Sequence, residues 1–354
     1  MAASNIGHNV DVSSLESQPR THETIADKIA HHYRCIYDLR TQWNDLSPIS
    51  ALPPEVLAEI FLHVAGIRAS NIHSRLPYID EWIYVSHVCR RWRFVALGCP
   101  ALWSRLTVKG PASCQWLPEF LARSNQVSLS MAISFETHSS FGFGTPLPEE
   151  LISIALSSLR RMRTLKIDAA PGYSPEIMKL LEGPAPLLED LYISETKPSG
   201  ILDPLNQLLR CPETCRLRRL DLKCPVDWAG ISLSGLTRLS VGSSYRVMKL
   251  DAFLAALAQM PRLEELATDG AFIPNYYGEA HTPSLPTPAH LPRIRTLRIW
   301  RETAAQCACI LRSMETPALA QLSVNAIPRG SVASQIELFA ASAAKRKSWG
   351  DSSP

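Results

Sequence analysis

The sequence has no long apolar run that is free of charge. An ordinary membrane-spanning helix needs about 20 such residues in succession, and the 354-residue chain contains no run of that length. Residues 1–5 lack the basic and then apolar pattern of a secretory signal, and no Asn-x-Ser/Thr glycosylation acceptor is present. These absences exclude an ordinary membrane protein and predict a protein of the cytoplasm, the nucleus or both.

Clusters of one charge are also missing. Charged residues make up 19% of the chain, and the formal net charge is only +3. The lysines and arginines are dispersed and form no run typical of a nucleic-acid footprint. The nine cysteines are odd in number and scattered, which is typical of reduced thiols inside a cell. We therefore expect no nucleic-acid partner, no membrane partner and no disulfide framework.

Motifs for catalysis and for metal binding are absent too. The sequence has no Gly-x-Ser-x-Gly elbow, no His-Glu-x-x-His pair and no Gly-x-x-x-x-Gly-Lys phosphate loop. Two cysteine groups lack the paired spacing of a zinc site and are expected to be buried thiols: Cys211, Cys215 and Cys224, and Cys307 and Cys309. The sequence predicts a protein that is not an enzyme and holds no cofactor.

What the chain does have is apolar material for a packed core, since 46% of its residues are hydrophobic. Residues 1–23 and 345–354 are polar and are expected to be tails. Between them, residues 24–47 predict an amphipathic helix that ends before Pro48. Its apolar stripe consists of Ile25, Ile29, Tyr33, Ile36, Leu39, Trp43 and Leu46. This helix either packs on the following domain or forms a short coiled coil through which two copies associate.

Residues 49–106 predict two further helices with more apolar surface than so small a unit can bury. The first begins at Pro53 and Pro54, which suit the first turn of a helix. Its apolar face is formed by Leu57, Ile60, Phe61 and Val64. The second begins near Glu81 and ends at Gly98, and residues 66–80 between them are expected to be a loop. Its stripe is formed by Val85, Val88, Cys89, Trp92, Val95 and Ala96.

The order Leu-Pro-x-Glu-x-Leu-x-x-Ile-Phe, then Val-Cys-x-x-Trp, then Leu-Trp resembles the F-box family, and most of all its fungal F-box-like subgroup. The resemblance implies a three-helix module that binds the Skp adaptor of cullin-RING ubiquitin ligases. The residues it implies for the adaptor contact and the helix bundle are Leu52, Pro53, Glu55, Leu57, Ile60 and Phe61, with Val85, Val88, Cys89 and Trp92. The alternative is that these residues pack on this protein's own downstream domain.

Residues 107–344 repeat a Leu-x-x-Leu-x-Leu pattern, which resembles leucine-rich repeats. Seven such cores begin at Met162, Leu188, Leu217, Leu236, Leu263, Ile294 and Leu319, and their central residues are 26, 29, 19, 27, 31 and 25 positions apart. Helices are expected at 148–160, 175–181, 202–209, 250–260, 304–314 and 334–344. The pattern predicts a parallel strand-and-helix solenoid, and the alternative is a compact α/β domain with fewer true repeats.

Two departures make this an irregular, degenerate repeat array. The spacing varies, and the Asn or Cys of a regular repeat is replaced by Ala170, Thr196, Pro225, Ser244, Glu302 and Ile327. The usual buried polar ladder is therefore expected to be absent. Residues 132–148 and 270–292 are expected to be insertions or loops.

The fold class expected from all of this is α/β (α+β overall), with an N-terminal helix, an F-box and a solenoid. The function expected is that of a substrate-recognition subunit of an SCF-type cullin-RING ligase, with the F-box on the adaptor and a protein target on the repeats. The alternative is an adaptor-bound protein-interaction scaffold without a ubiquitin-ligase role. Target specificity is expected on the strand-lined face and in residues 270–292.

Overall fold

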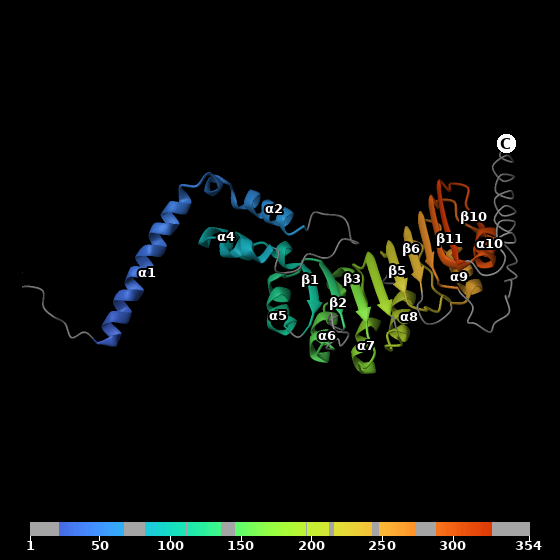
Figure 1. The fold of residues 1–354 in the computed structure, drawn as a ribbon, viewed down its shortest axis with the longest axis horizontal. Helices are drawn as coiled ribbons and strands as arrows, with labels where there is room; N and C mark the ends of the chain where they lie inside the picture. Colours follow the sequence, from blue (N-terminus) through green and yellow to red (C-terminus); the bar gives the residue numbers. More distant parts are fainter. Residues whose placement is uncertain are drawn as a thin grey trace, which may run out of the picture.

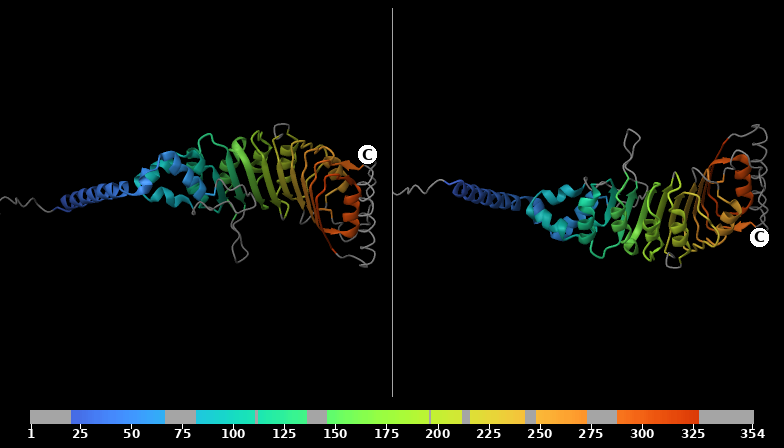
Figure 2. Two further views of the ribbon diagram at one scale, coloured as in Figure 1. Left: turned by 90° about the horizontal axis from the view of Figure 1, so that it is seen from above. Right: turned by 90° about the horizontal axis from the view of Figure 1, so that it is seen from below.

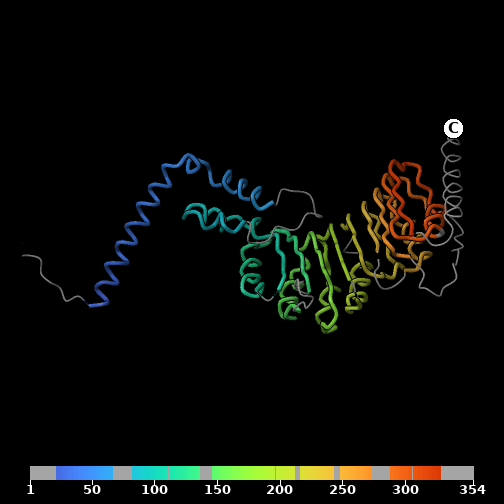
Figure 3. Tube along the Cα trace, in the orientation of Figure 1, coloured from blue at the N-terminus to red at the C-terminus, as the bar shows by residue number. Residues whose placement is uncertain are grey.

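The computed structural model describes residues 21–66, 82–110, 112–135, 146–195, 197–211, 216–242, 248–272 and 288–327. The described part of the chain begins with helix α1 (His22–Asp45), which projects away from the sheet and its helices (Figures 1 and 3). Thr21 caps this helix, because its hydroxyl accepts a hydrogen bond from the Thr24 amide at 3.3 Å. None of the residues of α1 is buried, so the expected packing of this helix on the next domain is not observed in the described residues.

A helical segment (residues 48–103) follows. It consists of η2 (Pro48–Ala51), α2 (Pro54–Val64), η3 (Ile83–His87), α4 (Arg90–Leu97) and η4 (Pro100–Trp103). The prediction of one continuous helix from Glu81 is wrong, because Cys89 has extended backbone angles and separates η3 from α4. The β-branched residues Val85 and Val88 favour this break, since branching at Cβ lowers helix propensity. Residues 67–80 of the expected loop lie outside the described residues.

After the helical segment, the chain forms a nine-stranded sheet in which every pair of neighbouring strands is parallel. Its spatial order is β1 (Arg105–Lys109), β2 (Leu129–Ser134), β3 (Met162–Ala169), β4 (Asp190–Glu195), β5 (Arg219–Lys223), β6 (Arg238–Gly242), β7 (Glu265–Asp269), β9 (Thr296–Thr303) and β11 (Gln321–Ile327). The strands thus lie side by side in chain order (Figure 2). Two short strands, β8 (Ala289–His290) and β10 (Met314–Glu315), form a separate parallel pair.

All seven repeated cores belong to this sheet. Six of them place their last two apolar residues on the same face, as Leu191 and Ile193 do in β4, and the core of β7 has Thr268 at the last position. Strands β1 and β2 lie outside the seven cores and were not predicted. The expected loop at 132–148 begins inside β2, which runs to Ser134. Residues 136–145 of that loop lie outside the described residues, as do residues 273–287 of the other expected loop. The expected domain boundary at residue 107 falls within β1.

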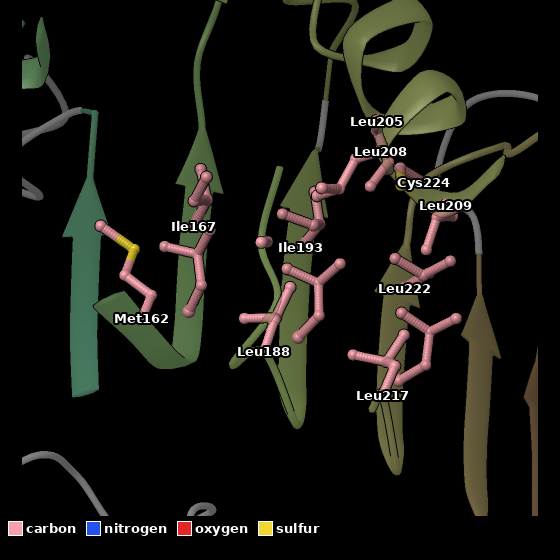
Figure 4. Close-up of a cluster of buried hydrophobic side chains, with 14 of the residues drawn as sticks. Met162, Ile167, Leu188, Ile193, Leu205, Leu208, Leu209, Leu217, Leu222 and Cys224 are labelled. Carbon is pink, nitrogen blue, oxygen red and sulfur yellow. The ribbon is translucent and has the colours of Figure 1, made fainter. Parts of the chain in front are cut away.

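Helices connect many of the strands and pack against the apolar face of the sheet. They are α5 (Ser113–Arg123), α6 (Glu149–Leu156), α7 (Pro175–Lys179), α8 (Leu202–Arg210), α9 (Leu250–Leu257) and α10 (Ala304–Arg312), with the short turns η5 (Leu159–Arg161) and η6 (Leu180–Glu182). Figure 4 shows Leu205 and Leu208 of α8 beside Ile193 and Leu222 of the sheet. Helix α5 was not predicted, and the expected helix at 334–344 lies outside the described residues.

Buried carboxyl groups hold two of the turns that follow the strands. Glu195 accepts hydrogen bonds from the amide and the hydroxyl of Ser199, both at 2.6 Å. Glu302 is fully buried and accepts from the amides of Ala271 at 2.7 Å and Phe272 at 3.3 Å. Glu302 occupies one of the six sites where no buried polar group was expected. At this turn a single glutamate satisfies the backbone N–H groups in place of the ladder of a regular repeat.

Candidate adaptor-binding site

Helix α2 carries apolar side chains along two adjacent strips of its surface. Leu57 and Phe61 point inward and have no exposed surface, while Val56, Ile60 and Val64 are 44%, 37% and 55% exposed. The three exposed residues are four positions apart, so they form one stripe along the helix. A helix of a monomeric protein normally turns only one apolar face inward and leaves a polar face to water. The outward stripe of α2 therefore has the character of a contact surface.

The inward side of α2 is fixed to α4. The rings of Phe61 and Trp92 are 5.0 Å apart, and the Arg91 guanidinium donates hydrogen bonds to the carbonyl oxygens of Ser50 and Leu52. These two bonds tie α4 to the chain just before α2 begins. The outward stripe is thus held on a supported helix.

The helical segment is also tied to the start of the sheet. The indole N–H of Trp103 donates to the carbonyl oxygen of Ala96 at 2.9 Å, and Arg105 of β1 donates to the carbonyl oxygen of Gly66. The Arg105 side chain is partly buried, and this burial lowers its pKa from the ordinary value. Such a bond connects the end of α2 with the first strand.

Exposed apolar side chains are also present on the second part of the segment. Tyr84 lies in η3, Val88 directly follows η3, and Phe94 lies on α4. Their neighbours Val85 and Val95 are buried. The two parts of the helical segment therefore both expose large apolar groups beside a closed interior.

The structure divides the predicted contact residues into three groups. Pro53, Glu55, Ile60 and Val88 are exposed, and Leu52, Cys89 and Trp92 are half-buried. Leu57, Phe61 and Val85 are buried. Leu57 and Phe61 belong to the chain's own core, and Phe61 packs on Trp92 of α4, so in this structure neither side chain offers surface to an adaptor.

Four exposed apolar residues were missed by the sequence prediction. They are Val56, Val64, Tyr84 and Phe94; Val64 had been placed on the same face as Leu57. The signal for two of them was present, since Val56, Ile60 and Val64 recur every four residues beside the inward pair. A helix that is apolar around most of its circumference indicates burial on more than one side.

The cysteines of the described residues are free thiols. Cys224 and Cys307 are buried, and burial raises the pKa of the Cys307 thiol to about 12. A thiol with so high a pKa is protonated at neutral pH and is a poor nucleophile. Within the described ranges, no group of three or more His, Cys, Asp or Glu side chains is arranged to hold a metal ion. No helix in that part of the chain has both the length and the apolar character needed to cross a membrane.

Comparison with known proteins supports the resemblance for one part of the chain. The F-box-like family model matches residues 49–109, which begin in η2 and end with β1. A search of curated proteins gave no match. Residues 49–109 thus form an F-box-like domain, a class that generally binds Skp adaptors of cullin-RING ligases. The α2 stripe and the exposed residues Tyr84, Val88 and Phe94 all lie inside the matched range.

Proposed function

We propose that residues 49–109 bind a Skp adaptor and that the chain serves as the target-recognition subunit of an SCF-type cullin-RING ubiquitin ligase. The observation that carries the proposal is the outward stripe of Val56, Ile60 and Val64 within the F-box-like domain. Fully burying a Val or Ile side chain stabilises a complex by roughly 1.5–3 kcal/mol. Because these three are about half exposed, a gain of roughly 1 kcal/mol each is expected from closing them.

The sheet would then hold the target. Its succession of parallel strands in chain order, with helices between many of them, supports an irregular, degenerate leucine-rich-repeat solenoid over residues 107–344. The strand face opposite the helices is polar and carries Asp190, Arg219, Arg238 and Glu265. Charged and hydrogen-bonding groups of this kind suit recognition of another protein. F-box proteins are generally non-catalytic, so the contribution of the chain would be to bring target and enzyme close together.

An adaptor-bound scaffold without a ligase role is the second candidate. The same outward stripe supports it, since adaptor binding does not depend on what happens to the bound target. The two candidates differ in target turnover. If the chain acts in a ligase, inhibiting the cullin is expected to lengthen the lifetime in cells of a target held by the sheet. If the chain is a scaffold, the lifetime of that target should not change.

Adaptor binding is tested with purified Skp adaptor and the full chain. The double variant Val56→Asp/Ile60→Asp places two charges on the stripe and should lose binding in calorimetry while keeping its circular dichroism spectrum. Leu322→Asp on β11 is the matched control, because Leu322 is exposed to a similar degree but lies far along the sheet. Undiminished binding by the stripe variant would show that the adaptor contacts another surface.

Helix α1 supports a separate proposal, which is self-association of two copies. Its stripe fits a heptad pattern with Ile29, Ile36 and Trp43 at one set of core positions and Ile25, His32, Leu39 and Leu46 at the other, so one core position is polar. Six of the seven predicted stripe residues therefore occupy one seam, and all six are exposed. In a parallel pair, Lys28 would face Tyr33 and Cys35 would face Arg40, so no like charges oppose each other.

Contacts on the other side of α1 leave this seam open. Asp38 forms an ion pair with Arg90 of α4 at 3.5 Å, and the Arg90 guanidinium lies 6.0 Å from the centre of the Tyr37 ring. Neither Tyr37 nor Asp38 belongs to the seam. The helix is thus oriented by contacts outside its apolar stripe, and the stripe itself remains available to a second copy.

Light scattering after size-exclusion chromatography tests the self-association. The wild-type chain is expected to give a dimer that dissociates on dilution, and Ile29→Asp/Ile36→Asp should give a monomer. Arg34→Asp/Thr41→Asp introduces the same residues on the opposite side of the helix and should leave the dimer intact. A wild-type monomer at every concentration would refute self-association through this helix.

A further inference from the structure

The edge of the sheet at which the strands begin contains a hollow of about 370 Å³. Its lining consists of Glu189, Arg216, Arg218, Gly235, Thr237 and Arg262. None of these residues belongs to the F-box-like domain. The hollow lies instead beside the starts of β4, β5, β6 and β7, in the part of the chain proposed to hold the target.

Hydrogen bonds between successive connections align the residues that line the hollow. The Arg218 amide donates to the carbonyl oxygen of Glu189 at 2.8 Å, and the Thr237 amide donates to that of Arg218 at 2.9 Å. The Glu264 amide donates in turn to Thr237 at 2.8 Å. These residues therefore occupy equivalent places in consecutive strands, each directly after the first leucine of its core.

A second row runs parallel to the first. Arg216, Gly235 and Arg262 each directly precede the first leucine of their core, and these leucines are all buried. The residues before β6, Gly235 and Thr237, therefore have the smallest side chains in the lining of the hollow. Adjacent strands are about 4.8 Å apart, so Arg216, before β5, and Arg262, before β7, stand about 10 Å from each other on either side of them. Two long side chains can reach a common ligand over that span.

The charge of the hollow is not neutralised by the protein. Among the residues that the structure describes, Arg216, Arg218 and Arg262 have no carboxylate within ion-pair distance, whereas Glu189 is already paired with Arg163 at 2.8 Å. Arginines on the neighbouring strand face behave differently. Arg219 is paired with Asp190, and Arg238 is paired with Glu265 at 2.6 Å. Three guanidinium groups that have no carboxylate partner in the described residues therefore surround one hollow.

We propose that this hollow binds an oxyanion group, a carboxylate or a phosphate, carried by an acidic segment of a bound protein. Guanidinium groups match both anions with paired N–H donors. The inference rests on the proposed role of the sheet in holding a target. It adds the chemistry of one element of that target and the three arginines that select it.

A peptide segment fits the hollow better than other anionic ligands do. None of its lining side chains is aromatic, so it offers no platform for stacking a nucleic-acid base. Arg216, Arg218 and Arg262 are all exposed, and the hollow contains no apolar side chain larger than the Thr237 methyl group. A small metabolite is normally enclosed in a largely apolar pocket. An anion presented on an extended chain needs only the open, charged edge that is found here.

Fluorescence anisotropy of the full chain with three labelled peptides tests the proposal. The probes are a peptide with a run of glutamates, the same peptide with phosphoserines in place of the glutamates, and a glutamine version. The charged peptides are expected to bind in a salt-sensitive manner and the glutamine version not to bind. The double variant Arg216→Gln/Arg262→Gln should weaken binding at least about tenfold. Arg93→Gln/Arg312→Gln removes two exposed arginines elsewhere and should have no effect.

The remaining measurements separate the sources of the anion and the two proposals. Stronger binding of the phosphoserine peptide identifies phosphate as the group selected, and equal or weaker binding identifies carboxylates. If inorganic phosphate alone binds as tightly as either charged peptide, or if no charged probe binds, the proposal is overturned. Equal binding by the wild type and by Arg216→Gln/Arg262→Gln overturns it as well. The double variant should still bind the Skp adaptor, so failure at the hollow is distinct from failure of adaptor docking.

Discussion

The Phe61 ring lies against the Trp92 indole with 5.0 Å between the ring centroids. Phe61 comes from α2 and has no exposed surface, while Trp92 comes from α4 and is half-buried. The pair joins two helices that are separated by residues 65–89, and aromatic pairs of this geometry contribute about 0.5–1.5 kcal/mol beyond the area that they bury. The outward stripe of α2 therefore depends on an inward contact with α4.

Replacing Phe61 by Ala should lower the free energy of unfolding by about 3–5 kcal/mol, because it leaves a cavity against Trp92. Ile60→Ala is the matched control on the next residue and should cost less than about 1 kcal/mol, since Ile60 is partly exposed. Urea denaturation of the full chain, followed by tryptophan fluorescence, measures both. Equal costs for the two variants would contradict the assignment of inward and outward sides.

Glu302 makes stability depend on pH. Burial raises its pKa to about 7, although the amides of Ala271 and Phe272 partly offset that rise. In the unfolded chain the pKa is expected near the ordinary value of 4.5. A raised pKa means that Glu302 favours the folded state while it is protonated. This contribution to the unfolding free energy is fully present below about pH 4.5 and is lost as the pH rises to about 7. The difference between the two pKa values corresponds to about 3 kcal/mol.

The pH dependence of Glu302 is checked with Glu302→Gln, which cannot ionise. Unfolding free energies of the wild type should fall between pH 4.5 and 7 by more than those of the variant. The same comparison with Glu119→Gln, an exposed residue of α5, should show no such difference. Parallel curves for the wild type and Glu302→Gln would exclude Glu302 as the titrating group.

Gly242 ends β6 where the neighbouring strand comes close. A Cβ atom at this position would lie 2.9 Å from the carbonyl oxygen of Asp269 in β7, so the two backbones would have to separate. Gly242→Ala should therefore destabilise the chain by about 1–3 kcal/mol. Ser240→Ala lies on the same strand and should change the stability by less than about 0.5 kcal/mol. Thermal unfolding of both variants decides the matter, and similar melting temperatures would count against the close approach.

The ion pair between Arg219 and Asp190 joins β5 to β4 and should be stronger than a helix-surface pair. The Asp190 side chain is only 8% exposed, and it also accepts a hydrogen bond from the Thr164 hydroxyl at 3.3 Å. Arg219 is 41% exposed, so solvent screening limits the coupling to about 1 kcal/mol. A double-mutant cycle on this pair should exceed the about 0.3–0.5 kcal/mol expected for Arg123 and Glu119 of α5. Equal couplings would refute the difference in burial as the cause.

Much of the sheet could be predicted because its signal is local. Alternation of leucines with polar residues marks each of the seven cores, and all seven form strands of one parallel sheet. Strand β1 was missed although Trp103, Leu106 and Val108 fit the same spacing, since the motif that precedes it had been assigned to the helical module. In β2, Gln126 occupies the first position of the pattern and hides the strand.

The candidate site was less accessible to prediction for a physical reason. Helix α2 is apolar on two sides, and its sequence alone does not state which side meets Trp92. Leu57 and Phe61 turned out to be inside and Val56 and Val64 outside, an outcome that α4 decides through packing. The unpaired state of Arg216, Arg218 and Arg262 was equally hidden, because it depends on which side chains the neighbouring strands bring to the same edge.

Strand order in this sheet also bears on how the protein is made. Each strand after β1 pairs with one that has already left the ribosome, so no strand of the nine-stranded sheet has to wait for a later one. The first strand is bonded to the end of α2 through Arg105 and the Gly66 carbonyl oxygen. Assembly can therefore proceed in the direction of synthesis. The F-box-like domain would be complete while the last strands of the sheet are still being translated.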